Sequence, residues 1–440
     1  MEIFIKAAQF FLSLSILVLL HEFGHFAFAR LFNTRVEKFY IFFDAWFSVF
    51  KFKKGDTEYG MGWLPLGGYV KISGMIDESM DKEQMKQPPK PYEFRSKPAW
   101  QRLLIMTGGV LVNFILALVI YASVLFVWGE QYLPTENAKY GIMADSLALE
   151  MGLKSGDKIV SVDGEEVEQF FQIMPAIVLN NAKSIEVMRN GEPITIPVKE
   201  ESVAKLIKNP SFISVRIPFI VGDFTDESLA DEAGMQVGDN IVAINGNPVT
   251  YFDEFKMQLS GLKNQDILVT VSRDGEMKEL ELTVPETGLI GVYPKGELSD
   301  FFELEKIEYG FFEAIPAGIN KGITTMSDYL KQFKLIFSPK TKAYESLGGF
   351  ITIGSIFPGE WNWQAFWTMT AFLSIILAIM NILPIPALDG GHVMFLFYEI
   401  ITGRKPGDKF MEYAQIAGMV LLLSLLLYAN GNDVVKLFNR

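Results

Sequence analysis

Long uninterrupted stretches of uncharged residues stand apart from the rest of the chain. Three stretches contain no Asp, Glu, Lys or Arg: residues 103–129, 361–388 and 413–432. A helix of roughly 20 predominantly apolar residues crosses the hydrocarbon core of a bilayer, which is about 30 Å thick. Each stretch is therefore long enough to span a membrane, and the pattern predicts three transmembrane helices.

The N-terminal apolar segment is different because ionisable residues interrupt it. Residues 7–20 contain no charged residue but are only 14 residues long, which is short for a span. The segment becomes long enough when it continues through His21, Glu22 and His25 to Ala29. The alternative is a signal peptide cleaved after Ala27-Phe28-Ala29, although its apolar core should not hold two histidines and a glutamate. We expect a fourth membrane helix with ionisable side chains at membrane depth.

The middle of the chain contains a duplicated pattern, because residues 146–167 and 228–249 align at an offset of 82 residues. Each copy predicts a short helix, a glycine-rich turn and a strand of alternating apolar residues that ends at Asp163-Gly164 or Asn245-Gly246. Both dipeptides favour a β-hairpin. The pattern resembles tandem bacterial PDZ domains, which can bind peptides by adding a strand to a sheet edge. A bulky shield that recognises no sequence is the alternative.

The segments beside the repeat have weaker patterns. Residues 36–52 are rich in aromatic and β-branched residues and predict, together with residues 63–70, one or two β-hairpins that lie against or dip into the membrane. Residues 82–92 contain three prolines and read as a solvated linker. Residues 309–337 have helical periodicity and are expected to pack near the outer membrane face.

Charge is distributed unevenly and predicts an orientation. Residues 130–361 hold 36 acidic and 20 basic residues, whereas the rest of the chain is slightly basic. Basic residues at the ends of membrane helices mark cytoplasmic loops. They follow the first segment, precede the second and lie between the third and fourth: Arg30, Arg35, Lys38, Arg95, Lys97, Arg102, Arg404, Lys405 and Lys409. The acidic region and both termini are therefore expected outside.

Composition narrows the classes of function. The chain has no cysteine, which removes disulfide scaffolds and thiolate metal sites. Its formal net charge of -13 argues against a nucleic-acid-binding protein, which normally carries a basic surface. Any bound metal ion must therefore be held by His, Asp or Glu.

The sequence His21-Glu22-Phe23-Gly24-His25 is an H-E-x-x-H pattern inside the first apolar segment. Histidines four residues apart lie on one helix face and can grip one Zn²⁺, while the neighbouring glutamate can act as a general base. Ionisable groups inside a membrane span are costly and usually functional. A pair of structural core histidines is the alternative.

Two histidines leave a catalytic zinc ion short of at least one ligand, because such sites usually have three protein ligands and water. The remaining candidates are Asp, Glu or His392, the third histidine of the chain. The third apolar segment ends in Asn-Ile-Leu-Pro-Ile-Pro-Ala-Leu-Asp-Gly-Gly-His from position 381 to position 392. Two prolines should stop the helix and two glycines should allow a tight turn beside Asp389. In the predicted orientation Asp389 and both histidines of the first segment lie near the cytoplasmic side. We expect His392 to have a structural role beside the site and not to bind the ion directly.

These motifs together resemble the site-2 protease family of intramembrane zinc metalloproteases, in particular its regulator-of-sigma-E type from Gram-negative bacteria. The resemblance covers nearly the whole chain. It implies that His21, His25 and Asp389 bind Zn²⁺ and that Glu22 activates water. It also implies a substrate-binding role for the N-x-x-P-x-P motif and for a reentrant β element: Asn381, Pro384, Pro386, Gly67, Gly68 and Tyr69. Two departures are visible, because Gly109-Val110 and Gly349-Phe350 stand where the family commonly has Gly-Pro.

The expected fold class is a polytopic α-helical membrane protein with four transmembrane segments, a membrane-associated β-hairpin region and two tandem PDZ (α+β) domains. The expected order along the chain is: 1–30, first span; 31–100, β loop and linker; 101–129, second span; 130–208 and 209–295, PDZ domains; 296–360, periplasmic helical region; 361–392, third span; 393–411, cytoplasmic loop; 412–432, fourth span; 433–440, tail.

The expected function is hydrolysis of a peptide bond within or near the membrane span of a protein that another protease has already trimmed. By resemblance, anti-sigma factors and remnant signal peptides are the expected substrates, and the bacterial inner membrane is the expected location. The alternatives are a membrane-tethered PDZ scaffold with a structural zinc site, which needs four protein ligands and no Glu22, and a metal transporter. A transporter needs polar residues along several spans, but the second and fourth contain none that ionise.

Overall fold

The computed structural model describes residues 1–65, 67–75, 87–336, 338 and 341–438. It consists of two compact units. The first comprises Met1–Gly129, Glu308–Phe333 and Tyr344–Arg440, and the second comprises Glu130–Ile307 and Lys334–Ala343. The linker prediction for residues 82–92 lies partly outside the described residues. The described part, residues 87–92, contains neither helix nor strand.

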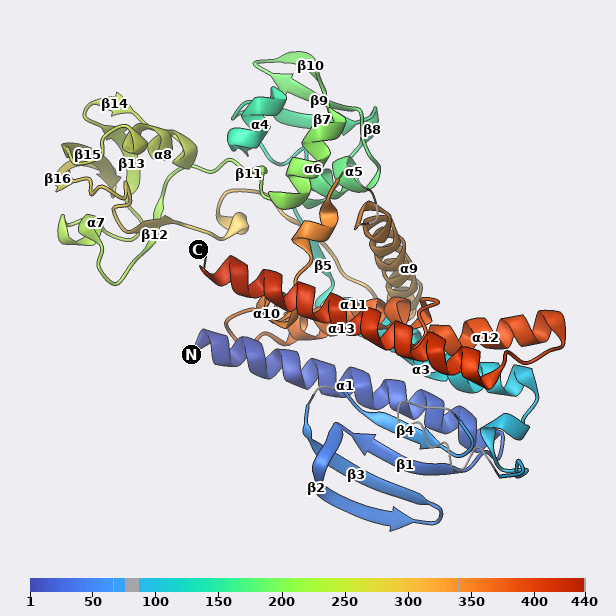
Figure 1. The fold of residues 1–440 in the computed structure, drawn as a ribbon. Helices are drawn as coiled ribbons and strands as arrows, with labels where there is room; N and C mark the ends of the chain where they lie inside the picture. The colour runs from blue at the N-terminus through green and yellow to red at the C-terminus, as the bar shows by residue number, and fades with distance from the viewer. Residues whose placement is uncertain (66, 76–86, 337, 339–340, 439–440) are drawn as a thin grey trace. The chain divides into compact units, whose positions relative to one another are not determined.

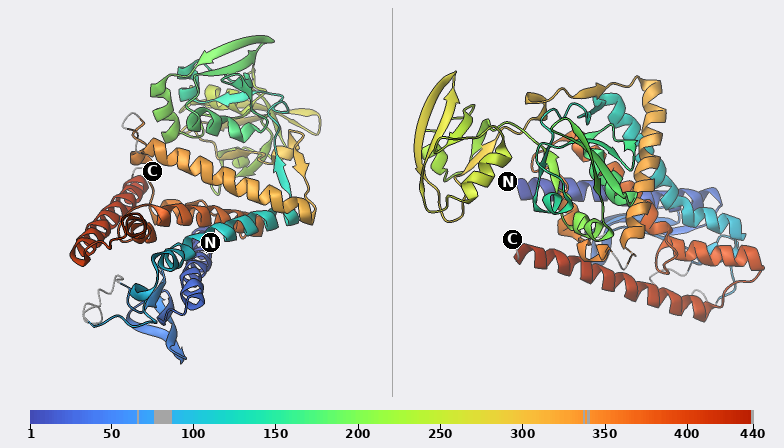
Figure 2. Two further views of the ribbon diagram at one scale, coloured as in Figure 1. Left: turned by 90° about the vertical axis from the view of Figure 1, so that its right-hand side faces the viewer. Right: turned by 90° about the horizontal axis from the view of Figure 1, so that it is seen from above.

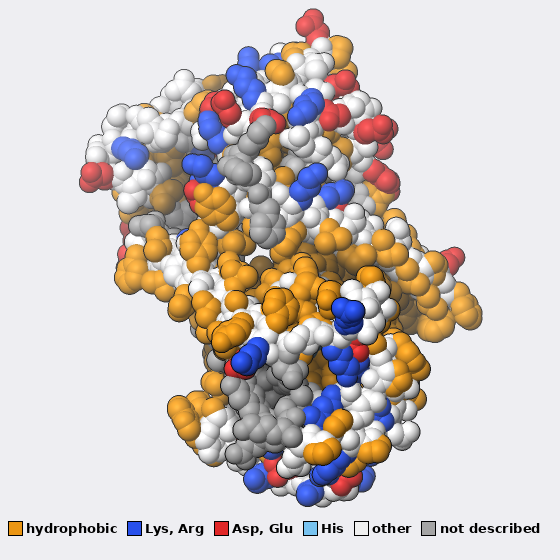
Figure 3. Space-filling model, turned by 45° about the vertical axis from the view of Figure 1, so that its right-hand side comes forward, with side chains coloured by type: hydrophobic (Ala, Val, Ile, Leu, Met, Phe, Trp, Pro, Cys, Tyr) orange, Lys and Arg blue, Asp and Glu red, His pale blue; other side chains and the backbone are white. Residues whose placement is uncertain are grey.

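Four helices of the first unit are long and apolar enough to cross a membrane, in agreement with the four spans predicted from the sequence. They are α1 (Glu2–Leu31), α3 (Ala99–Trp128), α11 (Trp363–Ile382) and α13 (Asp408–Phe438), shown in Figure 1. Hydrophobic side chains gather over the surface of this helical unit in Figure 3. The other helices of the unit are α9 (Phe311–Ile336), α10 (Phe350–Ser355), α12 (Asp389–Thr402), η1 (Phe94–Ser96) and η4 (Ala343–Ser346). Helix α9 ends in the second unit, and η4 begins in it.

Helix α3 is the centre of the first unit, because α1, α11 and α12 all pack against it. The α1–α3 contact is close because both helices present glycine. A Cβ atom on Gly24 would lie 2.3 Å from the carbonyl oxygen of Gly108, which is far inside van der Waals contact. Small residues allow such backbone contact between membrane helices. The H-E-x-x-H turn, which contains Gly24, is thereby pressed against α3.

The chain breaks between α11 and α12. Helix α11 ends at Ile382, because prolines 384 and 386 cannot continue it, and α12 begins at Asp389. The glycines after Asp389 do not form the tight turn expected from the sequence; they occupy the first turn of α12. A Cβ atom on Gly390 would lie 2.1 Å from the carbonyl oxygen of Leu383, and the start of α12 therefore packs directly on the preceding loop. Asp389 is fixed at a helix N-terminus.

Four strands form a sheet beside α1: β1 (Val36–Ile41), β2 (Phe43–Lys54), β3 (Thr57–Leu64) and β4 (Tyr69–Ile72), in the order β2-β3-β1-β4. The β2–β3 hairpin confirms the hairpin prediction. The parallel pairing of β1 with β3 is an additional finding. Strands β1 and β4 contact α1, and the left view of Figure 2 shows the blue sheet beside the N-terminal helix. Among the described strands, β4 lies at the edge of the sheet. Strand β2 exposes large apolar side chains, with Trp46 90% exposed.

The second unit contains the two repeats, each with a four-stranded sheet of the same topology, in the orders β10-β9-β7-β8 and β14-β13-β15-β16. The first sheet comprises β7 (Lys158–Val162), β8 (Glu165–Glu166), β9 (Ser184–Arg189) and β10 (Glu192–Pro197), and the second comprises β13 (Asn240–Ile244), β14 (Asn247–Pro248), β15 (Asp266–Arg273) and β16 (Glu276–Thr283). The helices are α4 (Ser146–Met151), α5 (Ile173–Leu179), α6 (Glu200–Lys208), α7 (Leu229–Glu232), α8 (Phe252–Ser260), η2 (Phe170–Gln172) and η3 (Leu298–Asp300). Paired short strands complete the unit: β5 (Glu130–Tyr132) with β18 (Glu305–Ile307), β6 (Ile142–Ala144) with β11 (Ile213–Val215), and β12 (Val221–Phe224) with β17 (Val292–Pro294).

The Gly-Asp dipeptide shared by the repeats has a structural role. Asp157 and Asp239 are both buried, and each accepts two hydrogen bonds of 2.7 Å from one arginine, Arg189 in the first repeat and Arg273 in the second. Desolvation alone would raise the pKa of Asp239. The hydrogen bonds from Arg273 and from the backbone N–H of Gln236, together with the positive charge of Arg273, outweigh it and lower that pKa below the usual value.

Asp239→Asn is expected to lower the unfolding midpoint of the second repeat by several degrees at pH 7, because Arg273 loses its ionic partner. A lowered folded-state pKa gives stability that is present above the unfolded-state value, about 3.9, and is lost as pH falls through the folded-state pKa. The difference between wild type and variant should therefore shrink below about pH 4. Thermal unfolding of the full-length chain at pH 7 and below pH 4, monitored by limited proteolysis, measures the loss of stability and its dependence on pH. Glu279→Gln, an exposed position on β16, is the control; an equal loss there would contradict this account.

Candidate functional site

Three ligand-type side chains converge in the first unit. His21 and His25 lie one turn apart on the buried face of α1, and Asp389 lies at the start of α12. The Nε2 atoms of both histidines are 3.2 Å from Asp389 Oδ2 and 3.2 Å from each other. Within the described part of the chain, this is the one group of His, Asp and Glu side chains that could hold a metal ion.

The geometry fits a tetrahedral metal ion. Nitrogen and oxygen ligands bind Zn²⁺ at about 2.0–2.2 Å, so that two ligands of a tetrahedral site lie roughly 3.3–3.5 Å apart. The three distances of 3.2 Å are close to that spacing. Asp389 Oδ2 is also buried and accepts no hydrogen bond, which leaves it available as a ligand. Three donors leave a fourth position open, as in catalytic zinc sites.

Helix α3 forms a second wall of the site, which the sequence did not reveal. The Nδ1 atom of His25 lies 2.8 Å from the carbonyl oxygen of Ile105, and that of His21 lies 3.2 Å from Nδ2 of Asn113. Gly109 lies between these contacts on α3. A Cβ atom there would be 2.6 Å from His25 Nε2, and thus only glycine lets both imidazoles reach this helix. One feature of the sequence could have indicated this face of α3: Asn113 is the one amide side chain within the apolar residues 103–129.

A cavity of about 490 Å³ opens onto these side chains. Glu22 lines the cavity beside the ligand-type residues, and so do residues of strand β4. A Cβ atom on Gly68 would lie 3.3 Å from Cγ of Glu22, and thus the chain entering β4 passes directly against that glutamate. The cavity therefore brings together the carboxylate of Glu22, the three ligand-type side chains and the edge strand β4.

The predicted substrate-binding residues lie at different distances from this cavity. Asn381 Nδ2 is 3.5 Å from His21 Nε2, and Gly68 and Tyr69 line the cavity. Gly67 immediately precedes them with a φ of +143°, a conformation that strongly favours glycine. The two prolines lie in the loop between α11 and α12; Pro386 lines a neighbouring cavity, and Pro384 lines neither of the two.

The hydroxyl of Tyr69 is held by a carboxylate on the same sheet. It donates a hydrogen bond of 3.0 Å to Asp44 Oδ1. Burial and this hydrogen bond raise the pKa of Tyr69 well above its usual value. The side chain therefore stays neutral at physiological pH and remains a hydrogen-bond donor at the edge of the cavity.

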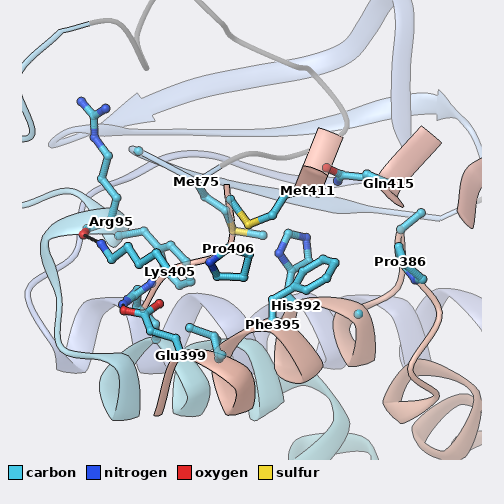
Figure 4. Close-up of a pocket in the computed structure, with 16 residues that line it drawn as sticks. Met75, Arg95, Pro386, His392, Phe395, Glu399, Lys405, Pro406, Met411 and Gln415 are labelled. Atoms are coloured by element: carbon cyan, nitrogen blue, oxygen red, sulfur yellow. Dashed lines mark hydrogen bonds and ion pairs between the residues drawn. The ribbon is translucent and has the colours of Figure 1, made fainter. Parts of the chain in front are cut away.

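A second cavity of about 240 Å³ adjoins the first and shares Met75, Ala387, His392 and Gln415 with it. Figure 4 shows the imidazole of His392 beside Phe395, among apolar side chains. An ion pair between Arg102 and Glu399 joins α3 to α12 at its wall. His392 is not part of the group of three ligand-type residues, and it borders both cavities instead.

Comparison with known proteins gives concordant matches. A model of "Peptidase family M50" matches residues 9–425. The regulator of sigma-E protease RseP of Escherichia coli K12 is 29% identical, with 98% of each chain covered, and the protease RseP of Yersinia pestis is 29% identical, with 99% of this chain and 100% of that protein covered. A protein of Neisseria meningitidis, provisionally named a zinc metalloprotease, is 28% identical over 97% of this chain and 98% of its own length.

Proposed function

This chain belongs to peptidase family M50, and on that premise we propose that it is an intramembrane zinc metalloprotease. It hydrolyses a peptide bond within or near the membrane span of another protein. The observation that carries the proposal is the convergence of His21, His25 and Asp389 at mutual distances of 3.2 Å, next to Glu22, in a unit built of membrane-length helices.

His21, His25 and Asp389 would hold the Zn²⁺ ion. When bound, zinc polarises a carbonyl group and makes water acidic enough to react near neutral pH. A structural zinc site takes four protein ligands, whereas three converge here among the described residues. The donor set therefore supports a catalytic site over a structural clamp.

Glu22 is the proposed general base. It follows His21 directly, lines the same cavity and is not one of the three ligand-type residues. Its carboxylate would take a proton from the attacking water and deliver it to the amine that leaves, a role for which a positioned carboxylate suits well. A side chain at position 68 would crowd the base, because a Cβ atom there would lie 3.3 Å from Cγ of Glu22.

Strand β4 and Asn381 are the proposed substrate contacts. A helical substrate hides its carbonyl groups in internal hydrogen bonds, so that its span must unwind before hydrolysis. The open edge of β4 would replace those bonds by pairing with the unwound segment. Gly67, Gly68 and Tyr69 would set the path of this strand, and Asn381, next to His21, would hold the substrate backbone. Pro384 and Pro386 would shape the adjoining loop.

The two repeats of the second unit are proposed to be PDZ domains on the periplasmic side of a bacterial inner membrane. The shared sheet topology and the Gly-Asp pattern support that assignment. They would either bind peptides or exclude proteins with bulky outer domains. Exclusion would make cleavage depend on earlier trimming by another protease. Anti-sigma factors and remnant signal peptides are the proposed substrates, as the family resemblance of the motifs implies. The name of one relative, a regulator of sigma-E protease, is consistent with the first class.

Removal of metal is expected to stop cleavage. Full-length protein treated with a chelator should lose hydrolysis of a trimmed single-pass membrane substrate, and stoichiometric Zn²⁺ should restore it, because two imidazoles and one carboxylate suit zinc. Mg²⁺, which prefers oxygen ligands, should not restore activity and is the matched control. Hydrolysis that persists in protein shown to be metal-free by elemental analysis would contradict the proposal.

A further inference from the structure

The side chain of Asn113 has an unexplained polar atom. The residue is completely buried on α3, and its Oδ1 atom has no hydrogen-bond partner. Its other terminal atom, Nδ2, lies 3.2 Å from Nδ1 of His21. Buried amide oxygens are rarely left without a hydrogen bond, because they lose their bonds to water and gain nothing that offsets this cost in free energy.

The ring of His21 requires an acceptor at this position. If its Nε2 atom, which points toward Asp389, binds a metal, the neutral ring carries its proton on Nδ1 and donates from there. Nδ2 of asparagine is also a donor, and two donors cannot satisfy each other. A half-turn about the Cβ–Cγ bond of Asn113 exchanges the amide nitrogen and oxygen and brings Oδ1 to His21.

His25 supplies a parallel within the same site. Its Nδ1 atom lies 2.8 Å from the carbonyl oxygen of Ile105, an acceptor on the same helix α3. Both imidazoles thus present Nε2 toward Asp389 and Nδ1 toward α3. An acceptor at Asn113 would complete for His21 what Ile105 does for His25.

The position of Asn113 is itself fixed. Ser374 on α11 donates a hydrogen bond of 2.7 Å to the backbone oxygen of Asn113. One turn earlier, Gly109 lets both imidazoles approach α3. The amide therefore has a defined place against the ring.

We propose that Asn113 is a positioning residue of the metal site: its side-chain oxygen accepts the Nδ1 proton of His21, which fixes the tautomer and the ring plane with Nε2 toward the ion. This inference rests on the proposed function, because it requires His21 to be a zinc ligand. Asn113 itself touches neither the ion nor the substrate in this role.

Zinc affinity tests the inference independently of proteolysis. Full-length protein is purified, stripped of metal and titrated with Zn²⁺ against a competing indicator. Asn113→Leu, of similar size but without an acceptor, should weaken zinc binding by about 10–100-fold, the range typical for lost partners of metal-binding histidines. Asn113→Asp should stay within about threefold of wild type, because either carboxylate oxygen accepts the Nδ1 proton.

Ser123→Ala is the matched control, since it removes a side-chain hydrogen bond at an exposed position of the same helix α3 and should leave zinc affinity unchanged. Should Asn113→Leu fail to fold, Asn113→Ala takes its place. Wild-type affinity in the acceptor-free variant, or an equal loss in Asn113→Asp, would overturn the role of the acceptor while leaving the metal site intact. A wild-type protein that binds no zinc would overturn the proposed function and this inference with it.

Discussion

Glu22→Gln is expected to abolish peptide-bond hydrolysis while zinc stays bound. Glutamine matches glutamate in size but cannot take up the proton of the attacking water. General bases contribute roughly 10²–10⁴-fold to rate, and a loss in that range is therefore expected. Zinc should remain because the three converging ligand-type side chains do not include Glu22. Cleavage of a trimmed single-pass substrate in proteoliposomes measures the rate, and elemental analysis of the same sample measures zinc.

Glu2→Gln provides the matched control, because it makes the same chemical change at the exposed first residue of α1. It should leave both rate and zinc content unchanged. Turnover retained by Glu22→Gln would remove Glu22 from the mechanism. Loss of zinc together with activity would assign Glu22 to the metal shell instead. Comparing membrane fragments from cells with wild type and with Glu22→Gln would then identify natural substrates.

Asp389→Asn is expected to empty most of the metal site. The substitution removes the one anionic ligand and offers a neutral amide, whose oxygen binds Zn²⁺ poorly. Loss of a direct ligand should exceed the roughly 10–100-fold effect of losing an indirect partner. Zinc per chain after dialysis should therefore fall well below the wild-type content, and hydrolysis should fall with it. Elemental analysis of dialysed full-length protein gives the occupancy.

His392→Gln tests whether His392, rather than Asp389, is the third metal ligand. His392 borders both cavities but is outside the group of three, so that this variant should keep its zinc. Unchanged occupancy in Asp389→Asn, with loss in His392→Gln, would exchange the two roles. A parallel loss in both would indicate that His392 shapes the start of α12 on which Asp389 is held.

The features that could be predicted are those carried by a single stretch of sequence. Apolar length revealed the four membrane helices, and the spacing of His21 and His25 placed both on one face. The internal repeat was visible as an alignment of glycines and aspartates. The pairing of Asp389 with the histidines needed one further step, the shared orientation of two spans.

The features that could not be predicted depend on which elements face each other. Helix α3 is apolar over nearly its whole length, and its sequence does not indicate which side meets the histidines. Gly109 therefore stands out in the sequence only as part of Gly109-Val110, where the family commonly has Gly-Pro, and Asn113 has no assigned role. The parallel pairing of β1 with β3 depends on partners that are not adjacent in the chain. At Gly390 and Gly391 the sequence favours a turn, because sequence alone does not distinguish a glycine needed for conformational freedom from one needed for close packing.

The glycine contact between α1 and α3 means that ligand identity is only half of what builds this centre. The same two histidines and aspartate, placed in another helix bundle, would not form this metal site if larger side chains held the helices further apart. Even one added methyl group at Gly24 or Gly108 would act as a spacer and change where both rings point. The distance between α1 and α3 is therefore as important to the metal site as its ligands, and it is set by glycines that have no side chain.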